Sequence, residues 1–358
     1  MRAALALARR GLGSAWPNPA VGCVLVKDGA VIGRGWTQPG GRPHGETEAL
    51  ERAGAAALGA TAYVSLEPCC HWGKTPPCTD ALIAAGVARV VLPVEDPDPR
   101  VSGRGIARLE EAGIEVASGI LAKEAAALNE GFFRRIQQGR PLVTLKLAST
   151  LDGRIATAQG ESRWITGEAA RDRAHLLRAR HDAVIVGSNT VIADDPELTC
   201  RLPGLGERSP VRVVVDGRLR VPLTSRVVVD AARVPTWFVT LRGDAPERHE
   251  AFRDCGVELI EVAADGETVD LAAALQELGR RGITRVLVEG GATLAAALVR
   301  ADLVDHVAWF RAPRLIGGDG IAAVTGFGLA ELAATPRFER VGVEPVGEDV
   351  LETFRRRA

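Results

Sequence analysis

Residues 61–78 have the sequence TAYVSLEPCCHWGKTPPC, in which a short apolar run leads directly into prolines and thiols. The β-branched and aromatic residues at 61–66 predict a strand. Cysteines follow at positions 69, 70 and 78, and a histidine and an acid precede the strand at His44 and Glu46. A strand that delivers thiols beside an imidazole predicts an α/β unit that binds a metal ion.

The sequence on either side of this stretch alternates between helix and strand patterns. A helical apolar spacing covers residues 5–12, and apolar runs at 20–26 and 30–35 flank Asp28-Gly29, a pair typical of the type I′ turn of a hairpin. Further patterns predict helices at 48–58, 80–85 and 105–112 and strands at 89–94 and 115–117. Such alternation predicts a largely parallel sheet sandwiched between helices.

A break in the pattern at residues 139–141 divides the chain. An amphipathic pattern predicts one helix over 122–138, and the sequence Gly-Arg-Pro then ends it immediately before an apolar strand at 142–147. The second half predicts strands at 182–186, 211–216, 236–240, 258–262, 285–289, 305–312 and 350–354, and a helix at 293–300. A length of 358 residues is sufficient for two cores, so we expect two α/β domains, at 1–140 and 141–358.

The composition is that of an ordinary globular protein without a strong electrostatic field. Lys and Arg number 44 against 45 Asp and Glu, a net charge of -1, and aromatic residues make up 4% of the chain. These values predict neither a nucleic-acid nor a membrane partner, and no apolar run is long enough to span a bilayer. Half of the six cysteines cluster at 69–78, unlike a distributed disulfide framework, which favours a reduced, cytoplasmic location.

His44, Cys69 and Cys78 form a ligand set typical of catalytic zinc. Zinc held by three protein ligands keeps a fourth position for water and lowers the pKa of that water, and an acid such as Glu46 can move the protons. The same set, with a glutamate that is not a ligand, occurs in zinc nucleobase deaminases. In those enzymes the cysteines are closely spaced, whereas here a loop separates Cys69 from Cys78, and Cys70 is placed to compete for the metal.

Other interpretations fit parts of this pattern. His44 alone would be an ordinary surface or core histidine, and the cysteines would be small buried apolar residues. A structural zinc site, in a protein used for binding, would recruit Cys70 or His71 as a fourth ligand. A zinc deaminase of another base or of RNA, with an unrelated second domain, would need a basic or aromatic surface that the composition does not indicate.

The first half contains PNPAVGC at 17–23, HGE at 44–46 and LEPCCHWGKTPPC at 66–78. These motifs resemble the deaminase half of the bifunctional riboflavin-biosynthesis deaminase/reductase family, which has this long loop between its cysteines. The resemblance implies a cytidine-deaminase-like three-layer α/β/α domain. It also implies that Zn2+ is bound by His44, Cys69 and Cys78, that the proton is carried by Glu46, and that the pyrimidine lies against Asn18 and His71. The chain departs from the family's usual Ala, Ser and His at Gly45, Cys70 and Trp72.

The second half contains KLASTLDGR at 146–154, GESRWIT at 160–166, GSNTV at 187–191, DDPELTCR at 194–201 and VEGGATL at 288–294. These motifs resemble the reductase half of the same family, which has a dihydrofolate-reductase-like α/β fold and uses NADPH. The resemblance implies NADPH contacts at Ala148, Trp164, Thr190, Asp194, Gly291, Ala292, Thr293, Leu294, Ala295, Ala296 and Ala297. It implies substrate contacts at Ser162, Arg178, Leu198, Arg201 and Glu289.

Two physical features accompany this resemblance. A strand that ends in Gly290-Gly291 before a helix places backbone N–H groups where a phosphate can approach. Arg178 and Arg201 carry guanidinium groups suited to a ribose phosphate, although most arginines in any sequence are solvated surface groups. No strand is followed by G-x-G-x-x-G, so a Rossmann dinucleotide domain is not indicated.

The implied activity is a pair of consecutive steps on one small molecule. The amino group at C2 of 2,5-diamino-6-(5-phosphoribosylamino)pyrimidin-4(3H)-one is hydrolysed in the first domain, and the ribosyl group is reduced to ribityl with NADPH in the second. Asp194 or Glu289 could orient or polarise the substrate of the reduction. The resemblance also implies a homo-oligomer formed through the second domain.

Overall fold

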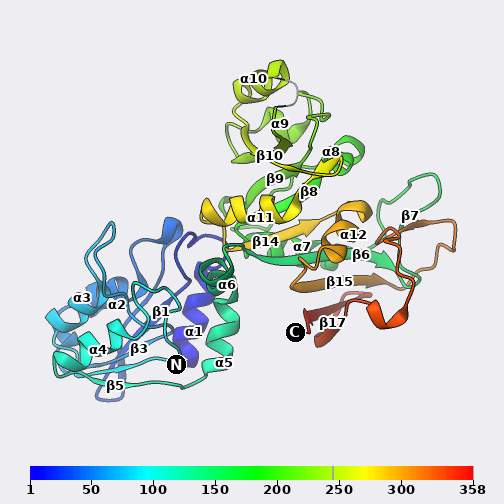
Figure 1. Ribbon diagram of the computed structural model, residues 1–358. Helices are drawn as coiled ribbons and strands as arrows, with labels where there is room; N and C mark the ends of the chain where they lie inside the picture. The colour runs from blue at the N-terminus through cyan, green and yellow to red at the C-terminus, as the bar shows by residue number, and fades with distance from the viewer. Residues whose placement is uncertain (244–245, 358) are drawn as a thin grey trace. The chain divides into compact units, whose positions relative to one another are not determined.

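The computed structural model describes residues 1–243 and 246–357. The chain forms two compact units, each with its own sheet and helices (Figure 1). The first consists of Met1–Pro141 with Gly279–Thr284, and the second of Leu142–Leu278 with the residues from Arg285 onward. Among the described residues, no helix has the length and apolar character that crossing a membrane requires.

The first unit is built on a mixed sheet with the strand order β2-β1-β3-β4-β5. Its strands are β1 (Gly22–Lys27), β2 (Ala30–Trp36), β3 (Thr61–Val64), β4 (Arg89–Val91) and β5 (Glu115–Ala117). The hairpin prediction is confirmed, since Asp28 and Gly29 both have the positive φ of a type I′ turn, at 50° and 75°. The parallel arrangement expected from the alternating pattern is confirmed for β3, β4 and β5. The sheet as a whole is mixed, because β1 is antiparallel to β2, its hairpin partner, and also to β3.

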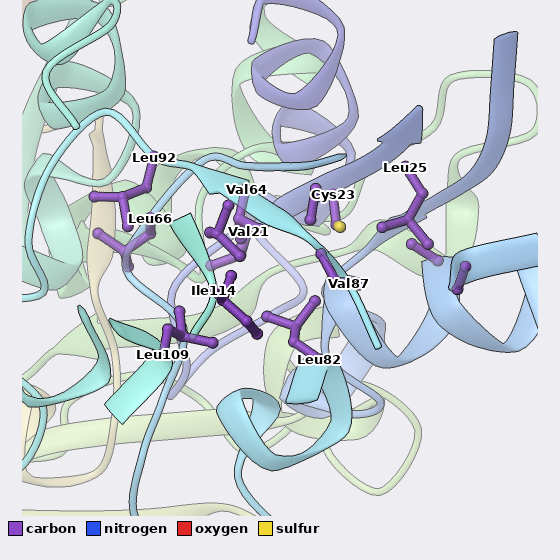
Figure 2. Close-up of a cluster of buried hydrophobic side chains, with 14 residues drawn as sticks. Val21, Cys23, Leu25, Val64, Leu66, Leu82, Val87, Leu92, Leu109 and Ile114 are labelled. Atoms are coloured by element: carbon purple, nitrogen blue, oxygen red, sulfur yellow. The ribbon is translucent and has the colours of Figure 1, made fainter. Parts of the chain in front are cut away.

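Alternating side chains of β1 divide the first unit into three layers. Cys23 and Leu25 belong to a buried cluster with Ala49, Leu82 and Leu109, shown in Figure 2. Those last three residues come from α2 (Gly45–Ala53), α3 (Cys78–Ala84) and α4 (Arg104–Glu111). A Cβ at Gly22, on the opposite face, would lie 2.0 Å from the carbonyl oxygen of Ala4 in α1 (Arg2–Ala8). The sheet therefore lies between α1 and the α2–α4 layer, as the implied three-layer fold requires.

Close backbone contact fixes the position of α2 against the hairpin. A Cβ added at Gly35 would lie 2.2 Å from the Gly45 carbonyl oxygen, and one at Gly33 would lie 2.3 Å from that of Ala49. Only glycine allows a helix to approach a strand this closely. Because α2 begins directly after His44, this packing also fixes the start of the candidate metal site.

The helix expected over 122–138 is divided into α5 (Ala122–Leu128) and α6 (Glu130–Gln138). The buried side chain of Asn129 separates them. Its Oδ1 accepts the backbone N–H of Ala20 at 3.0 Å, and its Nδ2 donates to the carbonyl oxygen of the same residue at 3.1 Å. This pairing holds Asn129 out of helical geometry, at φ -99° and ψ 15°. The helix expected over 48–58 begins and ends earlier than predicted. It covers Gly45–Ala53 and is followed by a 3₁₀ turn at Gly54–Ala57.

The second unit has a sheet with the order β11-β10-β9-β8-β14-β6-β15-β18-β17. From β11 to β15 in the sheet order, each strand is parallel to its neighbours. β18 is antiparallel to β15 and to β17, the last strand of the sheet. The strands are β6 (Leu142–Thr150), β8 (Ala183–Gly187), β9 (Val211–Val215), β10 (Thr236–Leu241), β11 (Glu258–Val262), β14 (Arg285–Glu289), β15 (His306–Ala312), β17 (Phe338–Val346) and β18 (Asp349–Arg356). Each strand expected in this half is present, and β17 was not expected.

The helices of the second unit follow its parallel strands. They are α7 (Glu168–Ala179), α8 (Ser188–Asp194), α9 (Arg226–Val229), α10 (Pro246–Asp254), α11 (Leu271–Arg280) and α12 (Ala292–Arg300). Two short pairs complete the unit, β7 (Arg154–Ala156) with β16 (Ile321–Ala322) and β12 (Ala264–Asp265) with β13 (Thr268–Val269). β8 and β14 are neighbours, so their carboxyl ends lie side by side, and in parallel α/β sheets such ends form ligand sites.

Candidate functional site

Three predicted ligands meet in the first unit. His44 precedes the first turn of α2, Cys69 follows β3, and Cys78 begins α3. The Nδ1 atom of His44 lies 3.2 Å from Sγ of Cys78 and 3.6 Å from Sγ of Cys69. Within residues 1–243 and 246–357, this is the group of His, Cys, Asp and Glu side chains arranged to hold a metal ion, with all ligand atoms within 4.8 Å of one another.

The two ligand thiols share their hydrogen bond unequally: Cys69 takes the charge, while the hydrogen bond with Cys69 and burial raise the pKa of Cys78. Hydrogen bonds from Cys78, one of them from its backbone N–H at 3.3 Å, lower the pKa of Cys69 to about 4. Cys69 is therefore ionised at neutral pH, as a metal ligand must be. One imidazole and two thiols match the donor set of a catalytic zinc site with an open fourth position.

Neither Cys70 nor His71 belongs to this ligand group. The Cys70 thiol instead donates to the carbonyl oxygen of Arg100 at 3.5 Å. A structural zinc site needs a fourth protein ligand. The arrangement of the described side chains thus favours the catalytic interpretation over the structural one.

Glu46 is a buried acid in the first turn of α2. Its side chain is 3% exposed, and its Oε2 has no hydrogen-bond partner among the described residues. Burial raises the pKa of Glu46 to about 7. A carboxyl group with this pKa gains and releases a proton near neutral pH, which is what a general acid/base requires.

A cavity of about 270 Å³ opens beside the ligand group and is lined by both predicted pyrimidine contacts, Asn18 and His71. Nδ2 of Asn18 donates to the carbonyl oxygen of Gly41 at 2.8 Å and lies 3.2 Å from Nε2 of His44. Nδ1 of His71 is buried and has no hydrogen-bond partner among the described residues. The cavity therefore offers an unused polar atom to a small molecule. Trp72 is 73% exposed.

Glu67, to which the sequence motifs assigned no role, holds the segment before Cys69 in place. Its buried carboxylate accepts backbone N–H groups from Asp96, Gly103, Gly105 and Ile106 at 2.9 to 3.2 Å. Three of these groups belong to the start of α4 and the residue before it. A carboxylate at a helix N-terminus satisfies donors that have no partner within the helix. The sequence Glu-Pro-Cys at 67–69 could have indicated this role, because it places the acid two residues before a ligand.

Replacing Glu67 with alanine is expected to destabilise the first unit by about 3 kcal/mol or more, because several buried N–H groups lose their acceptor. Urea unfolding measures the loss, and zinc titration should show weaker binding through displacement of Cys69. Glu110→Ala removes an exposed acid from α4 and should change the free energy of unfolding by less than about 0.5 kcal/mol. Equal effects of the two substitutions would show that the Glu67 hydrogen bonds do not hold this segment.

Asp96, which lies outside the sequence motifs, is a second buried acid on the cavity wall. Burial, followed by repulsion from Asp98 and Glu67, raises the pKa of Asp96 to about 7. Its Oδ1 accepts the backbone N–H of Asp98 at 2.8 Å. The Asp98 carboxylate is paired with Arg100, and these hydrogen bonds lower the pKa of Asp98.

Asp96→Asn is expected to raise the thermal unfolding temperature of the chelator-treated protein above pH 7 and to change it little below pH 4. The folded-state pKa lies above the ordinary value of 3.8, so the stability that Asp96 provides is complete below 3.8 and is lost as pH rises to about 7. Thermal melts across this range measure the difference. Asp98→Asn, the control, should act in the opposite direction because its pKa is lowered. If the difference in unfolding temperature between wild type and Asp96→Asn does not change with pH, the pKa of Asp96 is not raised in the folded protein.

In the second unit, the predicted substrate residues Arg178 and Glu289 form a bidentate ion pair. Nε and Nη2 of Arg178 donate to the two carboxylate oxygens at 2.5 and 3.0 Å. Burial alone would raise the pKa of Glu289, but the Arg178 charge outweighs it, and the pKa falls to about 2. Lys146 of the neighbouring strand places Nζ 3.9 Å from the same carboxylate. Lys146 belongs to the KLASTLDGR motif, which predicted no role for it, and its position beside Glu289 depends on the register of β6 and β14.

The loop that carries Leu198 and Arg201 lies against this ion pair. Nη1 of Arg178 donates to the carbonyl oxygen of Thr199 at 2.9 Å. Leu198 is buried and has a φ of 57°, in the left-handed region that a branched residue rarely adopts. Arg201 is exposed and paired with Glu197 at 3.0 Å. Four of the five predicted substrate residues are thus brought together, and Ser162 lies in the loop between β7 and α7.

The predicted cofactor residues gather where β8 and β14 end. Thr190 of α8 lies within 3.4 Å of the Cβ positions of Gly290 and Gly291, which have φ values of 80° and 85°. Gly291 precedes α12, which contains Ala292, Thr293, Leu294, Ala295, Ala296 and Ala297. The carbonyl oxygen of Asp194 accepts from Arg163, which brings the Trp164 loop to the end of α8. Trp164 is 61% exposed, and Ala148 lies in β6.

Both halves match known protein families. Residues 1–94 match the cytidine and deoxycytidylate deaminase zinc-binding region, and residues 141–351 match the RibD C-terminal domain. The riboflavin biosynthesis protein RibD of Escherichia coli is 45% identical over 98% of this chain and 96% of its own length. The protein of the same name from Aquifex aeolicus is 41% identical over 99% of this chain and 97% of its own.

Solved structures agree with these sequence matches. Acinetobacter baumannii RibD superimposes with a TM-score of 0.89 at 41% identity, covering 100% of this chain and 98% of that one. A diaminohydroxyphosphoribosylaminopyrimidine deaminase/5-amino-6-(5-phosphoribosylamino)uracil reductase from Thermotoga maritima gives a TM-score of 0.87 at 37% identity, covering 100% and 97%. A cytidine-deaminase-like domain thus precedes a dihydrofolate-reductase-like domain, and the chain belongs to the RibD family of bifunctional deaminase/reductases of riboflavin biosynthesis.

Proposed function

We propose that the first unit hydrolyses the C2 amino group of 2,5-diamino-6-(5-phosphoribosylamino)pyrimidin-4(3H)-one. The observation that carries this proposal is the buried, unpartnered Oε2 of Glu46 beside a group of three zinc ligands. His44, Cys69 and Cys78 would hold the metal, which when bound supplies a Lewis acid that lowers the pKa of water in its open position. Glu46 takes a proton from the attacking water and gives it to the departing amine, and a pKa of about 7 suits both transfers.

Within the cavity, Asn18 and His71 are proposed to hold the pyrimidine ring. Nδ1 of His71 is available for a hydrogen bond, and the Asn18 amide is fixed by Gly41 next to His44. A ring held by these two side chains beside Glu46 would present C2 to the ligand group. Positioning of this kind converts a bimolecular reaction into an effectively unimolecular one.

The second unit is proposed to reduce the ribosyl group of the deaminated product to ribityl. NADPH, when bound at the Gly291 end of α12 with Ala148, Trp164, Thr190 and Asp194, supplies the hydride. Arg178, Leu198, Arg201, Ser162 and Glu289 are the proposed substrate contacts. Arg201 is suited to the phosphate because it is exposed, while Arg178 keeps Glu289 ionised. We place the functional boundary at residues 140 and 141, so that 1–140 deaminates and 141–358 reduces.

The proposal extends to the surroundings of the enzyme. The substrate is a small phosphoribosyl pyrimidine, with no nucleic acid or membrane as a partner. The described cysteines are free thiols, and the two ligand thiols must stay reduced to bind zinc, which supports a cytoplasmic location. A homo-oligomer formed through the second domain is part of the same proposal.

Mass spectrometry of the diaminopyrimidine ribose phosphate, incubated with zinc-loaded protein, tests both steps at once. Without NADPH we expect a product that has exchanged its amino group for oxygen, and with NADPH the same product with two added hydrogens. Reduction of preformed deaminated substrate without any deamination would refute the role of the first unit. Turnover of cytosine, guanine or tRNA instead of the diaminopyrimidine would support the rival deaminase.

A further inference from the structure

Arg42 lines the deaminase cavity and lies two residues before the ligand His44. Its side chain is partly buried, and Nη1 donates to the Thr75 hydroxyl. Arg42 thereby links the segment before α2 to the loop between Cys70 and Cys78. The guanidinium group lies at the cavity wall where these two segments meet.

The backbone on either side of Arg42 is held in place. The carbonyl oxygen of Gly41 accepts from Asn18, and a Cβ at Gly41 would lie 2.7 Å from Nδ2 of that side chain. The carbonyl oxygen of Pro43 accepts the backbone N–H of Gln38 at 3.1 Å. Because the hydrogen bond to Thr75 also restrains the side chain, the Arg42 guanidinium group loses less conformational entropy when it binds a ligand than a free arginine would.

Two other arginines line the same cavity, and each donates hydrogen bonds from two of its three guanidinium nitrogens. Arg100 forms hydrogen bonds with both carboxylate oxygens of Asp98, so its charge is neutralised. Arg135 donates from Nε to the carbonyl oxygen of Gly279 and from Nη1 to that of Pro17. In the part of the chain that the structure describes, Arg42 has no ion pair with a carboxylate, and one of its guanidinium nitrogens, Nη1, donates to Thr75.

We propose that Arg42 binds the phosphate of the substrate in the deaminase cavity and makes this site selective for phosphorylated ribosides. The inference rests on the proposed function, because that substrate carries a phosphate beyond the ring. A guanidinium group offers parallel N–H donors that match two phosphate oxygens, and Arg42 retains donors for this purpose. The phosphate would lie near Thr75, at the opposite end of the substrate from Glu46.

The test compares deamination of the diaminopyrimidine ribose phosphate with that of the same riboside after phosphatase treatment. In zinc-loaded full-length protein, Arg42→Ala should lower kcat/KM for the phosphorylated compound by about tenfold to a hundredfold, chiefly through KM, and leave the dephosphorylated riboside unchanged. Arg42→Lys should recover part of the loss, since it keeps the charge without the fork. Ribose 5-phosphate should inhibit deamination by wild-type protein, and its inhibition constant should rise in Arg42→Ala by a similar factor.

Arg89→Ala is the matched control, because Arg89 is a half-exposed arginine of the first unit paired with Glu115. Arg89→Ala should leave kcat/KM for both compounds and the inhibition constant of ribose 5-phosphate unchanged. Unchanged deamination of the dephosphorylated riboside by the same Arg42→Ala sample reports that the first unit is folded, and reduction of deaminated substrate reports the same for the second unit. If Arg42→Ala keeps the wild-type preference for the phosphorylated over the dephosphorylated riboside, the inference is overturned. It is also overturned if this preference is lost only in Lys74→Ala, which removes the exposed cation next to Thr75. If the wild-type protein deaminates neither compound, the proposed function fails first.

Discussion

Glu46→Gln is expected to lower the rate of deamination by about 10² to 10⁴-fold, because glutamine cannot exchange a proton between the attacking water and the departing amine. The buried position of Glu46 suits an amide of the same size, so folding should be preserved. Ammonia release from the diaminopyrimidine substrate measures the effect. NADPH oxidation with the deaminated substrate, measured on the same sample, should be unchanged.

Glu48→Gln is the control for this prediction. Glu48 lies in the same helix, where it forms an i, i+4 ion pair with Arg52, and such pairs contribute only about 0.3–0.5 kcal/mol. Zinc content should be equal in both variants, since neither residue is a ligand. Loss of both activities in a folded, zinc-loaded Glu46→Gln protein would contradict two independent sites. An unchanged rate of deamination would show that a group other than Glu46 carries the proton.

Glu289→Ala is expected to destabilise the second unit by about 3–5 kcal/mol, because Arg178 and Lys146 would remain buried without their counter-charge. Reduction should be lost as well, since the variant removes a proposed substrate contact. Urea unfolding and NADPH oxidation measure the two effects. Glu344→Ala, which breaks the more exposed ion pair with Arg173, should cost about 0–1 kcal/mol.

The pH dependence separates this prediction from a simple packing defect. The pKa of Glu289 lies below its ordinary value of 4.5, at about 2, so the stability it provides is complete above 4.5 and is lost as pH falls toward 2. The difference in unfolding free energy between wild type and Glu289→Ala should therefore shrink over this range. A difference that is constant with pH would show that the lost stability comes from packing and not from the charge.

Sequence patterns were informative where chemistry and local geometry coincide. The His44, Glu46 and Cys78 motifs predicted part of the site because each lies at the start of a helix, where the chain direction is fixed locally, and Cys69 follows β3 in a short loop. The hairpin at Asp28-Gly29 was predictable for the same reason, since a type I′ turn depends on two residues.

The features that sequence patterns missed depend on contacts between distant segments. Asn129 divides a continuous amphipathic pattern because its amide pairs with Ala20, 109 positions earlier. Lys146 lies beside Glu289 only through the pairing of β6 with β14. β17 was missed because its side chains are mostly exposed and it contains Gly342 and Pro345, which are unfavourable in strands. Tertiary structure, and not local propensity, decides these positions.

The close approach of α4 to the Glu67 segment has a consequence for how this protein can change over evolutionary time. A Cβ at Gly105 would lie 2.3 Å from the Pro68 carbonyl oxygen and 3.0 Å from Oε1 of Glu67. A larger residue at 105 would therefore expel the carboxylate, and a smaller residue at 67 would leave the Gly105 N–H without its acceptor. Substitutions at these positions are expected to be strongly epistatic. A substitution at position 67 or 105 is therefore tolerated only together with a compensating substitution at the other. Neutral substitutions around the zinc ligands are expected at other positions.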